Sequence, residues 1–256
     1  MVKPSHIIAL FLVPALFVGG FLLYGKIKGK PFRPASPWET SAKTVDAKME
    51  GVTFHIPGNH LRSLLELSDR KPDELANGFM VHALMPDFLP FSYEHKDDFI
   101  AEGQANKVVY VSIGRMCRVG PRSIDAKPCT ATSSLQSLFK VYAQSLAPVA
   151  EEKRPDNQDV PGMEHLGTRV STLEAKAGEL EKDIFAVNQG SAQAKLLICS
   201  RTDRVPNPQC TLKYIWRDKF LISISFARAM KDDWALIREK ADHFFTSVSE
   251  WPEEAT

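Results

Sequence analysis

The chain has 256 residues, of which 44% are hydrophobic and 25% are charged. This composition is close to that of an average globular protein and argues against wholesale disorder. Domains usually contain about 100 to 200 residues, so the chain has room for one large domain or two small ones. Its 32 basic and 31 acidic residues give a formal charge of +1. No strong overall field therefore favours nucleic acid, and we expect no nucleic-acid partner.

An uncharged apolar run of 19 residues extends from Ile7 to Gly25. As a helix at about 1.5 Å per residue it would be roughly 28 Å long, close to the roughly 30 Å hydrocarbon core of a bilayer. We therefore predict a transmembrane anchor over residues 1–25, with residues 7–25 in contact with lipid. A signal peptide cleaved at Val18-Gly19-Gly20 is the alternative. The proline-containing, charged residues 26–50 are predicted to be a juxtamembrane linker.

A folded domain is predicted over residues 51–250. Apolar residues alternate with polar ones from Val52 to Ile56, which is typical of a half-buried strand. Asn59 can cap a short helix that follows. Later strands are predicted at residues 79–85, 107–113, 163–170, 183–187 and 195–199, and a helix is predicted after Ser133 or Ser134, with Leu135, Leu138, Phe139, Tyr142 and Leu146 at helical spacing.

The last part of the sequence predicts a hairpin and a terminal helix. Residues 211–217 and 219–226 flank a turn around Asp218, and the second run alternates strictly between two faces. Asp232 can cap a final helix whose apolar stripe begins at Trp234. The predicted fold class is α+β: an N-terminal transmembrane helix followed by a mostly antiparallel sheet packed by helices. Residues 51–150 and 160–250 are interpreted either as a duplicated strand-loop-helix unit or as a coincidence of common parts.

The four cysteines form two pairs, Cys117 with Cys129 and Cys199 with Cys210, with eleven and ten residues between the members. Each pair encloses a polar loop after a strand-like run, which indicates two local disulfides. Zinc is less consistent with these spacings, because structural zinc ligands usually come in close pairs. Free buried thiols remain an alternative. Disulfides imply an oxidising compartment.

The two arguments about orientation disagree. The lysines after the apolar run would keep the domain in the cytoplasm under the positive-inside rule, whereas the paired cysteines favour the oxidising side. We expect a single-pass protein of the bacterial inner membrane with its C-terminal domain in the periplasm.

Arginines within the two cysteine-closed loops are the candidate partner-binding residues. They are Arg118 and Arg122 in the first loop and Arg201 and Arg204 in the second. Rigid loops lose less entropy on association, and arginine is enriched at interfaces. Solubilisation of a surface turn is the alternative role for these side chains.

The sequence contains no hydrolase, zinc-protease or nucleotide-binding motif. His55, His60 and His95 could supply a base or a metal ligand, but scattered histidines also become neighbours by chance. We therefore expect no enzyme activity, no catalytic residue, no metal and no cofactor.

The second half contains Cys199, the run PNPQC that ends at Cys210, a hairpin, and DDW before Ile237. The first half contains IPGNHL, then an apolar strand and Pro86-Asp87-Phe88. These short motifs resemble membrane-anchored periplasmic proteins of the immunity type that are encoded beside type VI secretion toxins. The resemblance implies a non-enzymatic, membrane-tethered binding protein that occludes a toxin. A structural subunit of a cell-envelope or secretion assembly is the alternative function.

Overall fold

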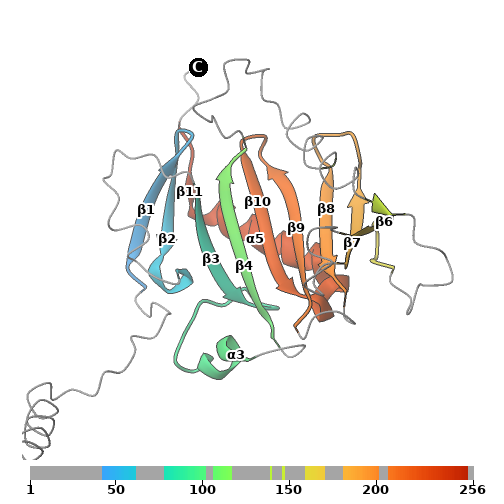
Figure 1. Cartoon of the computed structure of the whole chain (residues 1–256). Coiled ribbons are helices and arrows are strands. Elements are labelled where there is room, and N and C mark those ends of the chain that lie inside the picture. Colours follow the sequence, from blue (N-terminus) through green and yellow to red (C-terminus); the bar gives the residue numbers. More distant parts are fainter. Residues whose placement is uncertain are drawn as a thin grey trace, which may run out of the picture. The chain divides into compact units, whose positions relative to one another are not determined.

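The computed structural model describes residues 42–61, 78–101, 106–116, 139, 146–147, 159–170, 181–201 and 207–252. These residues belong to one compact unit that ends at Thr256. Most of the unit is antiparallel β-structure, with a helix near the C-terminal end of the chain (Figure 1).

An eight-stranded antiparallel sheet forms the body of the unit, in the order β3-β4-β10-β9-β8-β7-β6-β5. Its strands are β3 (Gly78–Leu84), β4 (Val108–Arg115), β5 (Leu146–Ala147), β6 (Glu164–Val170), β7 (Glu181–Val187), β8 (Lys195–Ser200), β9 (Gln209–Trp216) and β10 (Phe220–Ala227). The neighbouring strands β4 and β10 are more than a hundred residues apart in the sequence.

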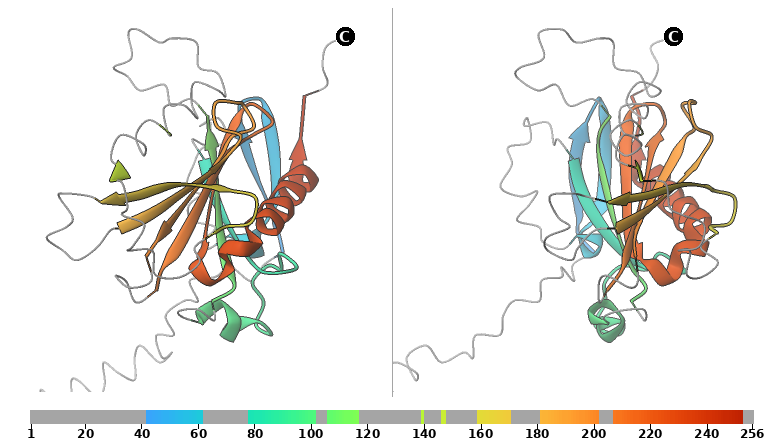
Figure 2. Two further views of the ribbon diagram at one scale, coloured as in Figure 1. Left: turned by 90° about the vertical axis from the view of Figure 1, so that its right-hand side faces the viewer. Right: turned by 45° about the vertical axis from the view of Figure 1, so that its right-hand side comes forward.

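A three-stranded sheet in the order β1-β2-β11 lies beside the large one (Figure 1). Its strands are β1 (Thr44–Met49), β2 (Val52–Pro57) and β11 (Ser249–Glu250). The helix α5 (Trp234–Val248) follows the 3-10 turn η5 (Arg228–Asp233) and runs along one face of the large sheet (Figure 2). Two shorter helices complete the described part: η1 (Gly58–His60) and α3 (Lys96–Ile100).

The core lies between α5 and the sheet face that it covers, here called the inner face. On β10 every second residue from Phe220 to Phe226 is buried on this face, and β9 alternates in register with it. Phe54 of β2 packs edge-on against Phe79 and Phe220, each with ring centroids 5.4 Å apart. The opposite face of the sheet, the outer face, is more polar.

The strand and hairpin predictions are confirmed at most positions, with shifts of one or two residues. The hairpin is β9 and β10, joined at Arg217 and Asp218. The final helix begins at Trp234, after η5, and Asp233 occupies its N-cap in place of Asp232. Leu146, predicted to be helical, lies in the strand β5. The other predicted helices lie largely outside the described residues, and β1, β11 and α3 were not predicted.

The predicted fold class is corrected by this arrangement. Within the described residues one long helix, α5, covers the inner face, so the sheet is not packed by several helices. Two equivalent strand-loop-helix units are not observed, because strands from both parts of the sequence hydrogen-bond into one continuous sheet. The fold is therefore mostly antiparallel β-structure with a C-terminal helix.

The prediction of a single-pass inner-membrane protein with a periplasmic domain is also corrected. The helices in the described ranges include none that is both long enough and apolar enough to cross a membrane. The physical reason is plain for α5, which has 15 residues and alternates buried apolar with exposed charged positions. Residues 7–25, which were predicted to span the membrane, lie outside the described part of the chain. Residues 26–41 of the predicted linker also lie outside it. Strand β1 already begins at Thr44, before the predicted domain start at Gly51.

Candidate protein-binding site

The outer face of the large sheet carries two small apolar clusters. One contains Leu84, Phe91, Phe99 and Val108 and packs against Tyr110, so α3 and the segment before it are held on the ends of β3 and β4. The other contains Ile184, Leu196 and Ile198, on β7 and β8. Because successive strand residues point to opposite faces, both clusters are separate from the core under α5.

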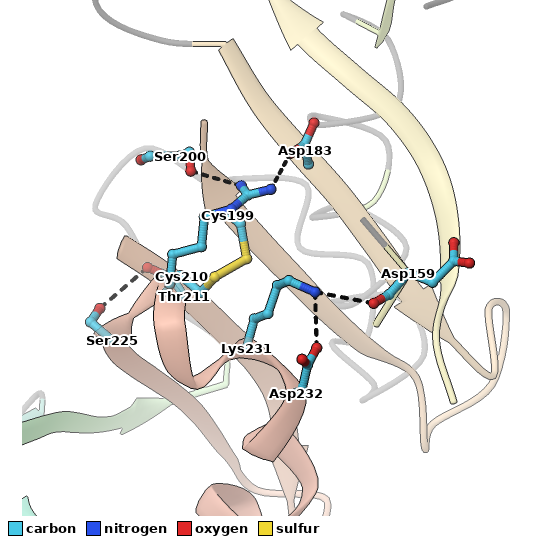
Figure 3. Close-up of a disulfide and its surroundings, with 10 residues drawn as sticks. Asp159, Asp183, Cys199, Ser200, Cys210, Thr211, Ser225, Lys231 and Asp232 are labelled. Atoms are coloured by element: carbon cyan, nitrogen blue, oxygen red, sulfur yellow. Dashed lines mark hydrogen bonds and ion pairs between the residues drawn. A yellow bond between two sulfur atoms is a disulfide. The ribbon is translucent and has the colours of Figure 1, made fainter. Parts of the chain in front are cut away.

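A polar strip separates the two clusters along β9 and β10. Thr211 Oγ1 lies 3.2 Å from Ser225 Oγ across these strands (Figure 3). Ser112 on β4 donates a hydrogen bond to the carbonyl oxygen of Ser223 over 3.4 Å. Lys213 lies in the same strip, and partial burial lowers the pKa of its amine.

A hollow of about 150 Å³ opens on this face, where the C-terminal end of α3 approaches β9 and β10. It is lined by Ala101, Asn106, Val108, Tyr110, Asn207, Pro208, Gln209, Ser225, Phe226 and Ala227. These residues offer amide, hydroxyl and apolar groups, and none of them carries a carboxylate, an imidazole, a thiol or an amine. Such a lining can accept and donate hydrogen bonds to a peptide. Ser225 is a possible nucleophile by residue type, but the lining residues include no histidine, lysine or carboxylate to act as its base.

Two large apolar side chains are exposed on α3 and the segment before it, which ends at the hollow. Tyr93 is 73% exposed and Ile100 is 57% exposed. Ile100 directly precedes Ala101 of the lining, and Tyr93 packs edge-on against the buried Phe91 with ring centroids 6.2 Å apart. Their backbone is fixed by the apolar cluster under α3, so both side chains are presented to solvent from an ordered support.

Figure 3 shows the disulfide between Cys199 and Cys210. Both cysteines belong to the core on the inner face, opposite the face on which the hollow opens. These cysteines face each other across β8 and β9. Gln209, the neighbour of Cys210, lines the hollow on the opposite face. The loop closed by the disulfide therefore ends in Asn207, Pro208 and Gln209 at one wall of the hollow.

A buried ion pair anchors the same region. Arg228 donates hydrogen bonds of 2.7 Å to Asp183 Oδ2 and to the carbonyl oxygen of Ser200 (Figure 3). The backbone N–H of Arg228 donates to the carbonyl oxygen of Pro208, and Thr168 donates its hydroxyl to Asp183 Oδ1. Both ends of the disulfide-closed loop are thus tied to η5, and the wall of the hollow has a rigid base.

The structure places the predicted site residues as follows. The predicted disulfide between Cys199 and Cys210 is confirmed. Cys117 and Cys129 lie outside the described residues, as do Arg118, Arg122 and Arg204. Arg201 is half-buried directly after β8, and its role in partner binding stays a prediction.

The three histidines considered for chemistry have different surroundings. His55 contacts Asp46 and Glu250 on the small sheet. His60 is buried, and its ring is tilted against that of Phe244 with centroids 4.6 Å apart. Its Nδ1 atom lies 3.0 Å from the carbonyl oxygen of His82, and burial lowers the pKa of the imidazole. His95 lies beside Asp98 at the start of α3. Within the described ranges no cluster of three histidine, cysteine or carboxylate side chains is arranged to hold a metal ion.

Tyr93, Ile100 and Tyr110 were not predicted as site residues. Tyr93 and Ile100 lie in a segment without a clear helical or strand period, and their exposure depends on how α3 folds back onto β3 and β4. Tyr110 lies within the predicted strand 107–113, where strand alternation alone does not mark it as a site residue. The part of the site that the sequence indicates is the cysteine-closed loop, through the spacing of Cys199 and Cys210.

No family model matches the chain, and no curated protein matches it. Among solved structures it is similar to Smlt3025, an immunity protein of the Stenotrophomonas maltophilia type IV secretion system, with 14% identity and a TM-score of 0.47 over 82% of this chain and 94% of that one. It is also similar to the iron-regulated outer membrane lipoprotein FrpD of Neisseria meningitidis, with 11% identity and a TM-score of 0.42 over 84% of this chain and 95% of that one. Smlt3025 is described as an immunity protein of a type IV secretion system. The sequence motifs of this chain resemble immunity-type proteins that are encoded beside type VI secretion toxins.

Proposed function

We propose that this chain is a non-enzymatic protein-binding protein of the immunity type, which binds a toxin at the hollow and occludes it. The observation that carries the proposal is the combination of exposed Tyr93 and Ile100 with a hollow whose lining residues offer hydrogen-bonding groups but no carboxylate, imidazole, thiol or amine. Large apolar side chains beside groups that can pair with a peptide backbone are typical of protein interfaces.

Burial of Tyr93 and Ile100 against a partner would favour binding energetically. Fully burying a side chain of the size of isoleucine stabilises a complex by roughly 1.5 to 3 kcal/mol, and tyrosine is enriched among the residues that dominate interfaces. The two residues stand on the apolar cluster under α3, while the disulfide and Arg228 fix the opposite wall. Little ordering is needed on association, so more of the contact energy appears as affinity.

The test uses the toxin encoded beside the gene for this chain. The two proteins are co-expressed, and binding is measured by co-purification and by titration calorimetry, with survival of toxin-expressing cells as a second readout. The variant Tyr93→Ser/Ile100→Ser is expected to bind at least tenfold more weakly and to lose protection. Both side chains are exposed, so the fold should be retained.

Leu236→Ser is the matched control, because Leu236 is also an exposed apolar residue, 37% exposed, but lies on α5. It should bind and protect like the unmodified chain. Equal binding by the double variant and the control would contradict the proposed site. Stable isolation of the chain within a larger assembly, with no binding to the neighbouring toxin, would instead favour a structural subunit of a cell-envelope or secretion assembly.

A further inference from the structure

The turn between β9 and β10 has an unusual sequence for its conformation. Arg217 and Asp218 both have positive φ, 48° and 55°. They are the central residues of a turn in which the backbone N–H of Lys219 donates to the carbonyl oxygen of Trp216 over 3.3 Å. Turns with positive φ at both central positions strongly prefer Asn-Gly or Asp-Gly, because side chains larger than glycine are strained there. Backbone strain of this sort tends to persist at functional positions, where the residue is needed for its side chain.

The side chain of Arg217 lies over two indole rings. Its Cζ atom is 5.2 Å from the ring centre of Trp216 and 5.0 Å from that of Trp251. Lys219 Nζ lies 5.1 Å from the centre of the same Trp251 ring. Trp216 is only 6% exposed, whereas Arg217 and Lys219 are exposed. These four residues, Trp216, Arg217, Lys219 and Trp251, are here called the hairpin tip.

The two cations of the hairpin tip lie near one ring, and Asp218 stands between them in the sequence without forming an ion pair with either. Because both atoms lie near the ring centre of Trp251, Arg217 Cζ and Lys219 Nζ are no more than about 10 Å apart. Charges still interact over this distance at 0.1 M salt. Among the described side chains no carboxylate forms an ion pair with either cation. Arg115, opposite Phe220 on β4, differs in this respect, because its Nε lies 2.9 Å from Glu50 Oε1.

We propose that the hairpin tip binds an acidic segment of a protein partner. A carboxylate of the partner that contacts Arg217 or Lys219 reduces the repulsion between them and accepts charge-assisted hydrogen bonds. The indoles hold the cations in position in advance, so little side-chain entropy is lost on binding. The hairpin tip lies at the opposite end of β9 and β10 from the hollow, so this surface is independent of the proposed toxin-binding site.

An acidic peptide fits this surface better than a nucleic acid does. Single strands bind largely by stacking bases on accessible aromatic faces. Here the ring of Trp216 is nearly buried, and that of Trp251 is approached by both cations. The cations, and not the rings, are the exposed groups.

The experiment measures binding of a fluorescein-labelled hexaglutamate peptide by fluorescence anisotropy at low salt. The unmodified full chain is expected to bind it and to lose affinity as salt is added, whereas hexalysine should not bind. Arg217→Gln/Lys219→Gln should bind hexaglutamate at least tenfold more weakly. The matched control is Lys96→Gln/Lys107→Gln, which removes the same charge from two exposed lysines near the other end of the sheet and should bind normally.

Asp218→Asn is a further test, because this variant is expected to bind more tightly and an unfolded variant would not. It removes the carboxylate adjacent to both cations, and asparagine tolerates positive φ well. We expect several-fold tighter binding of hexaglutamate. Equal affinities for the two double variants, no binding by the unmodified chain, or no gain with Asp218→Asn would overturn the proposal.

Discussion

Two ion-pair sites, one at the large sheet and one on the small sheet, have similar geometry and very different surroundings. Arg228 and Asp183 are 2.7 Å apart, with side chains only 6% and 2% exposed. His55 lies 2.8 Å from Asp46 and 3.0 Å from Glu250, but all three side chains are at least 43% exposed. Distance alone would rank these contacts as equals. Burial separates them, because water competes for the exposed charges and is excluded from the buried ones.

The two sites also differ in what they connect. Asp183 accepts hydrogen bonds from β6 and η5, and Arg228 reaches from η5 to the end of β8 and to Pro208. The buried site therefore joins five segments: β6, β7, β8, η5 and the residues before β9. His55 joins β2 to its two neighbours, β1 and β11, which are already paired through backbone hydrogen bonds. The buried site should be essential for folding and the exposed one dispensable.

The largest effect is expected for Arg228→Met. Methionine fills much of the same space but leaves Asp183 as an uncompensated buried charge, which typically costs about 3 to 5 kcal/mol. The free energy of unfolding, measured by urea denaturation followed by circular dichroism, should fall by this amount. A fall of less than about 1 kcal/mol would show that the ion pair is not buried as described.

The control for this variant is Asp183→Asn in the Arg228→Met background. Removing the second charge eliminates the unpaired carboxylate, while asparagine can still accept the hydrogen bond from Thr168. The double variant should therefore be more stable than Arg228→Met alone. A double variant that is less stable would mean that Asp183 contributes mainly through partners other than Arg228.

A somewhat smaller effect is expected when the disulfide behind the hollow is removed. Cross-linking a loop of about a dozen residues stabilises a fold by roughly 3 kcal/mol in the chain-entropy model. Cys199→Ala/Cys210→Ala should lose about this amount in the same urea assay, without a change in the cooperativity of unfolding.

Reduction gives an independent check of that value. Dithiothreitol should destabilise the unmodified chain at least as much as the double alanine substitution does. Any further loss when the double variant itself is reduced measures the contribution of Cys117 and Cys129, whose pairing remains a prediction. A double variant as stable as the oxidised chain would contradict a structural role for the bond between Cys199 and Cys210.

The strands were the predictable part of the fold, for a physical reason. A sheet with one face on the core produces strict alternation, as in Phe220 to Phe226, and that pattern is visible in a single sequence. The order of the strands in the sheet cannot be recognised from such a pattern. The pairing of β4 with β10 depends on contacts between distant segments. Strand β1 lacks a complete apolar alternation because only its second half, at Ala47 and Met49, is buried.

The site was predictable only where a covalent constraint marked it. The spacing of Cys199 and Cys210 indicated a closed loop, and the loop does form one wall of the hollow. Arg228 and Asp183 gave no signal, since charged residues in a sequence are normally read as exposed. Only the folded chain brings them together, from positions 45 residues apart.

The smallest effect is expected at the exposed site, and it depends on pH. Hydrogen bonds to Glu250 and then to Asp46 raise the pKa of His55 above its ordinary value. The protonated imidazole therefore stabilises the fold below the unfolded pKa of about 6.5, and this contribution is lost as pH rises through the higher folded pKa. His55→Gln should cost less than about 1 kcal/mol at pH 5.5 and still less at pH 8.5.

Comparing His55→Gln with the unmodified chain separates the effect of His55 on stability from that of His60. The two histidines change the stability in opposite directions as the pH rises. Burial lowers the pKa of His60, so its contribution is complete above the unfolded pKa and is lost as pH falls toward the folded value. Unfolding free energies measured from pH 5.5 to 8.5 contain both terms, and subtraction removes that of His60. A His55→Gln cost that grows with pH would reverse the assignment, because the contact would then favour the neutral ring.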